Sequence, residues 1–184
     1  MDVAHGAVTA TTTTTESSVG IEQRVTDHYE RRGRELWGLA RRLGATPEQC
    51  ADVVQEVHLR LWHELQRGAQ IKDLDAWAFR VAYRLVMDQH RLSRRVQGLI
   101  GRLTAGRVEA VSPALDDDLS LWPLVDRLPD RERVTLYLRY RSDLSFDQIG
   151  KVMGITTASA RTYGSRGVER IRAMVRDDDE GAVR

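Results

Sequence analysis

The chain has 184 residues and a net charge of +1, and it contains no apolar stretch long enough to span a membrane. Its charge is unevenly distributed, because residues 79–107 carry seven arginines and one acid, and residues 121–176 carry eleven bases and six acids. Two basic segments are typical of a polyanion-binding protein, whereas a solvated structural face would mix both signs more evenly. The N-terminus lacks a secretory signal pattern, so we expect a cytoplasmic protein without membrane insertion.

The first predicted elements follow an unstructured tail. Residues 1–20 are threonine-rich and lack apolar periodicity, so we expect a disordered tail. A helix is predicted from residue 21 to residue 43, with Gly44 as its stop. The run Thr46-Pro47-Glu48-Gln49 combines a capping box with proline at the first helical position and predicts a second helix. The buried face of this helix is predicted to hold Val53, Val54, Val57 and Leu61.

A third helix is predicted over residues 76–95, with Asp73 or Asp75 as its N-cap. Its predicted core stripe consists of Trp77, Val81 and Leu85, which are spaced by four residues. This spacing favours core packing of Trp77 over base stacking. Arginines dominate the polar side. Three helices with short loops predict a compact bundle over residues 21–96.

The second half of the chain begins where periodicity is lost. Residues 97–119 are rich in glycine and end in an acidic run, so we expect a flexible linker. A second small helical domain is predicted over residues 120–176, and residues 177–184 form an acidic tail. The predicted fold class is therefore all-α, with two small helical domains joined by a flexible linker.

The second domain ends in a helix-turn-helix pattern at Leu144–Arg172. Ser145 and Gln148 repeat the capping box, Gly154 makes the turn, and Thr156 or Thr157 caps the next helix. In this motif the second helix lies in the major groove and its N-terminal half reads base edges. The same helix contains Gly164 and Gly167, each predicted to cost roughly 0.5–1 kcal/mol relative to alanine.

Four motifs occur in a fixed order: ADVVQEVHLRLW at Ala51–Trp62, DAWAFRVAYRLVMDQHR at Asp75–Arg91, LPDRER at Leu128–Arg133, and the helix-turn-helix. In this order and spacing they resemble the bacterial sigma factors of the extracytoplasmic-function (ECF) group of the sigma-70 family, in the minimal form with regions 2 and 4. The resemblance covers residues 21–176. It implies an alternative sigma factor that binds core RNA polymerase, recognises the −10 and −35 promoter elements and melts the −10 element.

The resemblance also implies roles for particular residues. In the second helix, the residues facing the coiled-coil of the largest polymerase subunit would be Asp52, Gln55, Glu56, Leu59 and Arg60. In the third helix, the −10 contacts would be Arg80, Arg84, Asp88, Arg91, Arg94 and Arg95. The loop at residues 66–74 matches the segment that holds a base flipped out of the opening duplex.

Region 4 is implied to dock on the polymerase flap and to read the −35 element. Its expected DNA contacts are Thr157, Ser159, Arg161, Thr162, Ser165 and Arg166. Arg161 is the only charged residue in the first two turns of the recognition helix and suits a bidentate guanine contact. Arg84, Tyr163 and Gly164 depart from the usual residues of the family, so the preferred promoter sequences are expected to differ. The resemblance also allows for an anti-sigma factor as a partner.

The residue inventory argues against an enzyme. Cys50 is the only cysteine, so it forms no internal disulfide, and we expect it to act as a small buried apolar residue. The five histidines show no metal-ligand spacing, and we expect all of them at the surface. No glycine-rich phosphate loop follows a predicted strand. We therefore expect no catalytic residue, no metal and no cofactor.

Two other classes of protein compete with the sigma factor. One is a conventional helix-turn-helix regulator whose N-terminal bundle senses a ligand or dimerises. The other is an interaction protein whose basic helices are incidental. The arginine-rich third helix favours the sigma factor, because a sensor domain has no need of it.

Overall fold

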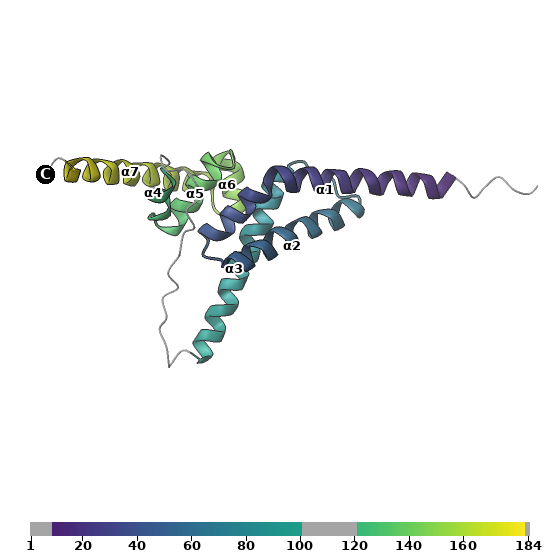
Figure 1. Ribbon diagram of the computed structural model, residues 1–184, viewed down its shortest axis with the longest axis horizontal. Coiled ribbons are helices and arrows are strands. Elements are labelled where there is room, and N and C mark those ends of the chain that lie inside the picture. The colour runs from purple at the N-terminus through teal and green to yellow at the C-terminus, as the bar shows by residue number, and fades with distance from the viewer. Residues whose placement is uncertain (1–8, 101–120, 183–184) are drawn as a thin grey trace, which may run out of the picture.

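The computed structural model describes residues 9–100 and 121–182, and the side-chain surroundings of residues 19–93 and 121–177. Every regular element in these ranges is an α-helix, which confirms the predicted fold class. The helices are α1 (Thr9–Arg42), α2 (Pro47–Gln66), α3 (Leu74–Ile100), α4 (Trp122–Asp126), α5 (Asp130–Tyr140), α6 (Phe146–Met153) and α7 (Thr157–Ala182). Figure 1 shows α1 and α7 projecting in opposite directions from a central group of helices.

The predicted capping boxes start two of the helices. At α2, the hydroxyl of Thr46 accepts from the backbone N–H of Gln49, whose side chain accepts from the N–H of Thr46 in return. Ser145 and Gln148 make the same exchange at the start of α6. Each box satisfies two backbone donors that a helix start leaves without an intrahelical partner.

The structure also decides between the alternative caps. Asp73, not Asp75, caps α3, because its Oδ1 accepts from the backbone N–H of Ala76 at 2.9 Å. Thr156 caps α7 by accepting from the N–H of Ser159 at 3.1 Å. Asp75 is thereby left free for contacts across the bundle.

Three helices extend further than the sequence predicts. α1 begins at Thr9, so residues 9–20 of the expected disordered tail are helical. α3 reaches Ile100 and α7 reaches Ala182, so the start of the expected linker and most of the expected acidic tail are helical too. Extending an existing helix orders one residue for each hydrogen bond gained, which costs much less than starting a helix. Polar segments that flank a helix packed on the core can therefore become helical too. The rest of these three segments lies outside the described residues.

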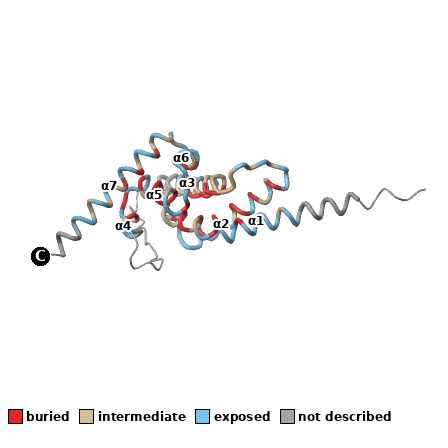
Figure 2. Tube along the Cα trace, turned by 90° about the horizontal axis from the view of Figure 1, so that it is seen from above, coloured by how far each residue is buried: buried red, intermediate tan, exposed pale blue. Residues whose placement is uncertain are grey.

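Helices α1, α2 and α3 form the predicted bundle, and all four predicted core positions of α2 are buried. Phe79 and Val86 of α3 and Leu36 and Leu39 of α1 are fully buried with them. Cys50 is buried as expected, and burial raises the pKa of its thiol to about 11. Figure 2 shows the buried positions gathered where the helices meet.

The two glycines inside α7 allow this helix to approach its neighbours closely. A Cβ at Gly164 would lie 2.9 Å from Cε1 of Phe146 in α6, and a Cβ at Gly167 would lie 2.9 Å from Cδ1 of Leu136 in α5. The sequence predicts only their cost to the helix. In the structure, this cost is offset by the close packing of the helices, which leaves no room for a side chain at either position.

The two halves of the chain touch, and the sequence does not predict this contact. One cluster of buried residues runs from the α1–α3 bundle into α5 and α6. Tyr137 of α5 is 3% exposed, and its hydroxyl donates to the carbonyl of Glu35 in α1 at 2.9 Å. Its ring fits against α1 because residue 38 is glycine, where a Cβ would overlap the tyrosine hydroxyl.

Polar contacts surround this apolar junction. Arg42 of α1 forms a 3.0 Å ion pair with Asp126, and Nε of Arg133 donates to the Arg42 carbonyl at 3.0 Å. On the other side, Nε2 of Gln148 in α6 donates to Oδ2 of Asp73 at 2.6 Å. These contacts place α5 beside α1 and α6 beside α3.

A substitution at Gly150 tests the packing of the helix-turn-helix. A Cβ at this position would lie 2.9 Å from the backbone oxygen of Ile155, which cannot move without opening the turn. We expect Gly150→Ala to lower the free energy of unfolding by about 1–3 kcal/mol. Gly20→Ala is the control, because nothing lies within 4 Å of a Cβ there, and it should stabilise the helix by about 0.5–1 kcal/mol. Urea denaturation followed by circular dichroism measures both, and equal effects would contradict the packing described here.

A substitution at Gly38 tests the junction between the two halves of the chain. In Gly38→Ala, the new methyl group displaces the Tyr137 ring and breaks its hydrogen bond to α1, so the halves should separate and the radius of gyration should rise in X-ray scattering. Gly33→Ala, on the same helix, is the matched control, because its Cβ would lie 3.8 Å from Tyr29, an ordinary contact. An unchanged radius in Gly38→Ala would show that this tyrosine does not hold the halves together.

Candidate nucleic-acid and partner-binding surfaces

The face of α2 opposite its buried side presents the five predicted polymerase contacts. Four of these residues are exposed and Glu56 is half-buried. Leu59 is 49% exposed, so this face includes apolar area. Arg60 pairs with Glu56 at 2.7 Å, one turn away. None of these side chains is needed for the core of the bundle, so the face is available to a partner.

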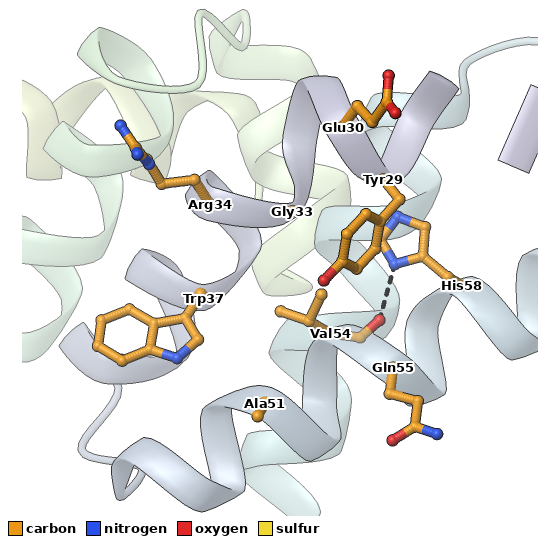
Figure 3. A pocket seen from close by; sticks show the side chains of 9 residues that line it. All are labelled: Tyr29, Glu30, Gly33, Arg34, Trp37, Ala51, Val54, Gln55 and His58. Carbon is orange, nitrogen blue, oxygen red and sulfur yellow. Dashed lines mark hydrogen bonds between the residues drawn. The ribbon is translucent and has the colours of Figure 1, made fainter. Parts of the chain in front are cut away.

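An open hollow of about 640 Å³ adjoins this face, between α1 and α2. Figure 3 shows Gln55 and Val54 of α2 on one side and the rings of Tyr29 and Trp37 on the other. The other lining residues are Glu30, Gly33, Arg34, Ala51 and His58. Because Gln55 belongs to both the α2 face and the hollow, the two form one continuous surface.

The sequence interpretation did not identify the α1 side of this hollow. On this side, Tyr29 is 54% exposed and Trp37 is half-buried. The four-residue spacing of Tyr29, Gly33 and Trp37 was the available signal, since such residues lie on one helical face. Nothing in that spacing distinguishes a surface groove from a core stripe.

The arginines of α3 divide between half-buried and exposed positions. Arg84, Asp88 and Arg91 are exposed and Arg80 is half-buried. Arg91 donates to Asp88 at 3.1 Å, and both side chains are 70% exposed. The side chains of Arg94 and Arg95 lie outside the described residues. Trp77 packs against the core, as its spacing predicts.

The loop from residue 66 to residue 74 turns at Gly68, whose φ is +78°. Its last residues lead into the α3 cap at Asp73, which also accepts the hydrogen bond from Gln148 of α6. The predicted base-capturing loop therefore lies beside the first helix of the helix-turn-helix motif.

In the recognition helix α7, three of the predicted hydroxyl contacts have partners within the protein. The Ser159 hydroxyl accepts from Thr156 at 2.9 Å, and the Thr162 hydroxyl donates to the carbonyl of Ala158 at 3.0 Å. Thr157 lies 3.5 Å from Asp147. By contrast, Arg161, Ser165 and Arg166 are exposed, and neither arginine has an ion-pair partner among the described residues.

Two neighbouring side chains of α7 are held by α5. Arg131 donates to the Tyr163 hydroxyl at 2.7 Å, and its guanidinium lies 5.6 Å from the ring centre. Arg170 forms a 2.9 Å ion pair with Glu132, which is 5% exposed. The arginines free to contact DNA from the N-terminal half of α7 are therefore Arg161 and Arg166.

The prediction that all histidines lie at the surface is wrong for two of them. His28 and His58 are 1% and 6% exposed, whereas His63 is exposed. A histidine can be buried when its ring nitrogens find polar partners, and the sequence does not reveal partners thirty residues away. Among the described residues, no group of three or more His, Cys, Asp or Glu side chains could hold a metal ion. None of the described helices has the length and apolar character that crossing a bilayer requires.

Family models match both halves of the chain. The model described as Sigma-70 region 2 matches residues 28–96, and the model described as Sigma-70, region 4 matches residues 119–171. The first therefore covers the C-terminal part of α1, all of α2 and most of α3, and the second covers α4 to α6 and the N-terminal part of α7. Together they span well over half of the chain.

Characterised relatives agree with these matches. The chain is 28% identical to the ECF RNA polymerase sigma factor SigL of Mycobacterium tuberculosis, over 81% of this chain and 87% of that protein. It is 23% identical to the ECF RNA polymerase sigma factor SigW of Bacillus subtilis, over 78% and 84% of the two chains.

Solved structures show the same fold. The sigma factor RpoE of Bartonella quintana, in complex with the anti-sigma factor NepR, matches with a TM-score of 0.66 at 18% identity, over 82% of this chain and 96% of that chain. CnrH, in complex with the cytosolic domain of CnrY, matches with a TM-score of 0.57 at 20% identity, over 90% and 96%. With region 2, region 4 and the ECF relatives all in agreement, the chain belongs to the ECF group of the sigma-70 family and is an alternative sigma factor that acts in transcription initiation.

Proposed function

We propose that the exposed face of α2, together with the adjoining hollow, docks this sigma factor on the coiled-coil of the largest subunit of core RNA polymerase. Leu59 and the rings of Tyr29 and Trp37 supply apolar area, and Gln55 and the Glu56–Arg60 pair supply a polar rim. Interfaces gain most of their energy where an anchor side chain fills a pocket surrounded by polar groups. The hollow beside Gln55 suits such an anchor from the polymerase.

We further propose that α3 binds the −10 element and α7 the −35 element. The exposed Arg84 and Arg91 of α3 suit the DNA backbone, and Arg94 and Arg95 follow on the same helix. Arg161 on the first turns of α7 suits the edge of a guanine. The three hydroxyl residues Thr157, Ser159 and Thr162 have partners in the protein, so they suit shape and phosphate contacts more than base reading.

The observation that carries the proposal is that both basic helices belong to one chain with a region 2 and a region 4. A conventional helix-turn-helix regulator would use α7 but would leave the α2 face and the α3 arginines without a role. As a specificity subunit, the protein acts in the cytoplasm with core polymerase and catalyses no reaction of its own. Region 4 would dock on the polymerase flap, and the fold shared with RpoE bound to NepR supports an anti-sigma factor as a further partner.

Substitutions in α2 test the docking surface. We expect Leu59→Ala and Gln55→Ala each to weaken association with core polymerase about tenfold or more, the effect of losing a central interface contact of about 1.4 kcal/mol. Gln66→Ala, at the exposed end of the same helix, is the matched control and should bind normally. Fluorescence anisotropy with labelled sigma factor measures the affinities, and circular dichroism checks the fold. Normal binding by both variants would remove α2 from the polymerase interface.

Substitutions in α7 test promoter reading. Arg161→Ala should cost about 1–3 kcal/mol at one base pair of the −35 element and relax the preference there. Arg166→Ala should weaken all sequences alike and flatten the salt dependence, as expected for a phosphate contact. Transcription by the holoenzyme from a promoter library randomised at −35 separates the two effects. A uniform loss in Arg161→Ala, with the preferred sequence unchanged, would contradict its base-reading role.

A further inference from the structure

Two imidazole rings face each other inside the α1–α3 bundle. Nδ1 of His28 on α1 lies 3.0 Å from Nε2 of His58 on α2, which is hydrogen-bond distance. Both side chains are almost completely buried. A hydrogen bond between two nitrogens needs one hydrogen between them, so the protonation of the outer nitrogens decides whether this contact is favourable.

The outer nitrogen of each ring faces an acceptor. Nδ1 of His58 lies 2.7 Å from the carbonyl oxygen of Val54, which only accepts, so this nitrogen must carry a hydrogen. Nε2 of His28 lies 3.4 Å from Oδ1 of Asp75 on α3. The His28 ring and the Arg32 guanidinium hold the pKa of Asp75 far below its usual range, so its carboxylate is ionised. An ionised carboxylate favours a hydrogen on the neighbouring Nε2 of His28.

With a hydrogen on both outer nitrogens, two neutral rings would point lone pairs at each other across 3.0 Å. One additional proton removes this conflict, because Nδ1–H of His28 then donates to Nε2 of His58. We propose that His28 and His58 form a buried proton-binding site that holds one shared proton and thereby links α1, α2 and α3.

The surrounding charges favour one proton in this site. Arg32 lies 2.6 Å from Asp75 and 2.7 Å from Glu35, so this row of partly buried groups has two negative charges and one positive charge. A proton on the histidine pair makes the row neutral, which lowers the cost of burying its charges.

The remaining charged and titratable neighbours lie towards solvent. Arg31 approaches Asp75 only at 3.4 Å and is 56% exposed, so its charge is largely screened by water. The Tyr29 ring meets the His58 ring edge-on with centres 5.1 Å apart and carries no charge. Glu30 and Arg34, which line the hollow with His58, are exposed. A second proton is disfavoured, because burial, and then the neighbouring His28, lower the pKa of His58.

The site makes the stability of region 2 depend on pH in both directions. In the unfolded chain, both histidines have the ordinary pKa of about 6.5. The two unfolded rings together hold two additional protons well below this pH and none well above it. The folded site holds one. Below this pH the unfolded chain binds more protons than the folded chain, so the stability rises as the pH rises. Above this pH the folded chain binds more protons than the unfolded chain, so the stability falls until the folded site loses its proton. The folding equilibrium constant changes by at most about tenfold per pH unit on each side.

Nitrogen-15 NMR of histidine-labelled full-length protein reads the protonation directly. At pH 7.5 we expect one buried ring with hydrogens on both nitrogens and a second with a hydrogen on Nδ1 only. Single substitutions His5→Gln, His63→Gln and His90→Gln assign the other three signals without touching the site. Two buried rings that each carry one hydrogen at this pH would overturn the proposal.

Unfolding by urea between pH 5.5 and pH 8.5 tests the thermodynamic consequence. The wild-type chain should be most stable near the middle of this range. In His58→Phe the acceptor nitrogen is absent, so the alkaline decline should be lost even if the variant is less stable. His63→Phe, at an exposed position on the same helix, should keep the decline. An equal decline in His58→Phe and the wild-type chain would refute a shared proton, and the NMR measurement still decides if that variant does not fold. Either failure leaves the polymerase and promoter roles unaffected, since those do not depend on the protonation of the histidine pair.

Discussion

The fit of Tyr137 against α1 is the contact on which the placement of the two halves depends. Its hydroxyl donates to the Glu35 carbonyl, the Arg42 guanidinium lies 4.5 Å from its ring centre, and Trp122 meets it edge-on at 5.7 Å. Burial raises the pKa of this tyrosine, so the phenol remains a neutral donor. A buried hydroxyl without a partner would cost about 1–3 kcal/mol, so the hydrogen bond fixes where α5 can sit on α1.

Helix α1 connects this junction to the side of region 2 that we propose binds the polymerase. The backbone of Glu35 holds Tyr137, while its carboxylate begins the row of charges that continues through Arg32 and Asp75 to the histidine pair. The row ends at the carbonyl of Val54, which lines the hollow beside the α2 face. Alternating charges are what allow so many ionisable groups within one small bundle. The same helix thus supports the contact with region 4 and one wall of the proposed polymerase site.

The candidate functional surfaces are the faces that the core does not need. On α2, valines at one side enter the bundle, which leaves Gln55, Leu59 and their neighbours exposed. On α7, Gly164 and Gly167 allow the helix to lie close to α6 and α5, while Arg161 on the same helix remains exposed to solvent. The glycines therefore set how closely α7 packs on its neighbours, and the helix cost that they impose is offset by this close packing.

The sequence by itself determined the helical fold, the capped starts of α2 and α6, the buried face of α2 and the family. These features depend on residues within a few positions of each other, through capping boxes and a periodicity of 3.6, and on motifs in a fixed order. The contact between region 2 and region 4, the choice of Asp73 as the cap of α3 and the burial of His28 and His58 were decided only in the tertiary structure. The two histidines are thirty residues apart, and Gly38 and Tyr137 are about a hundred apart. No local pattern reports such partners, because whether a polar side chain can be buried depends on which atoms the folded chain brings to it.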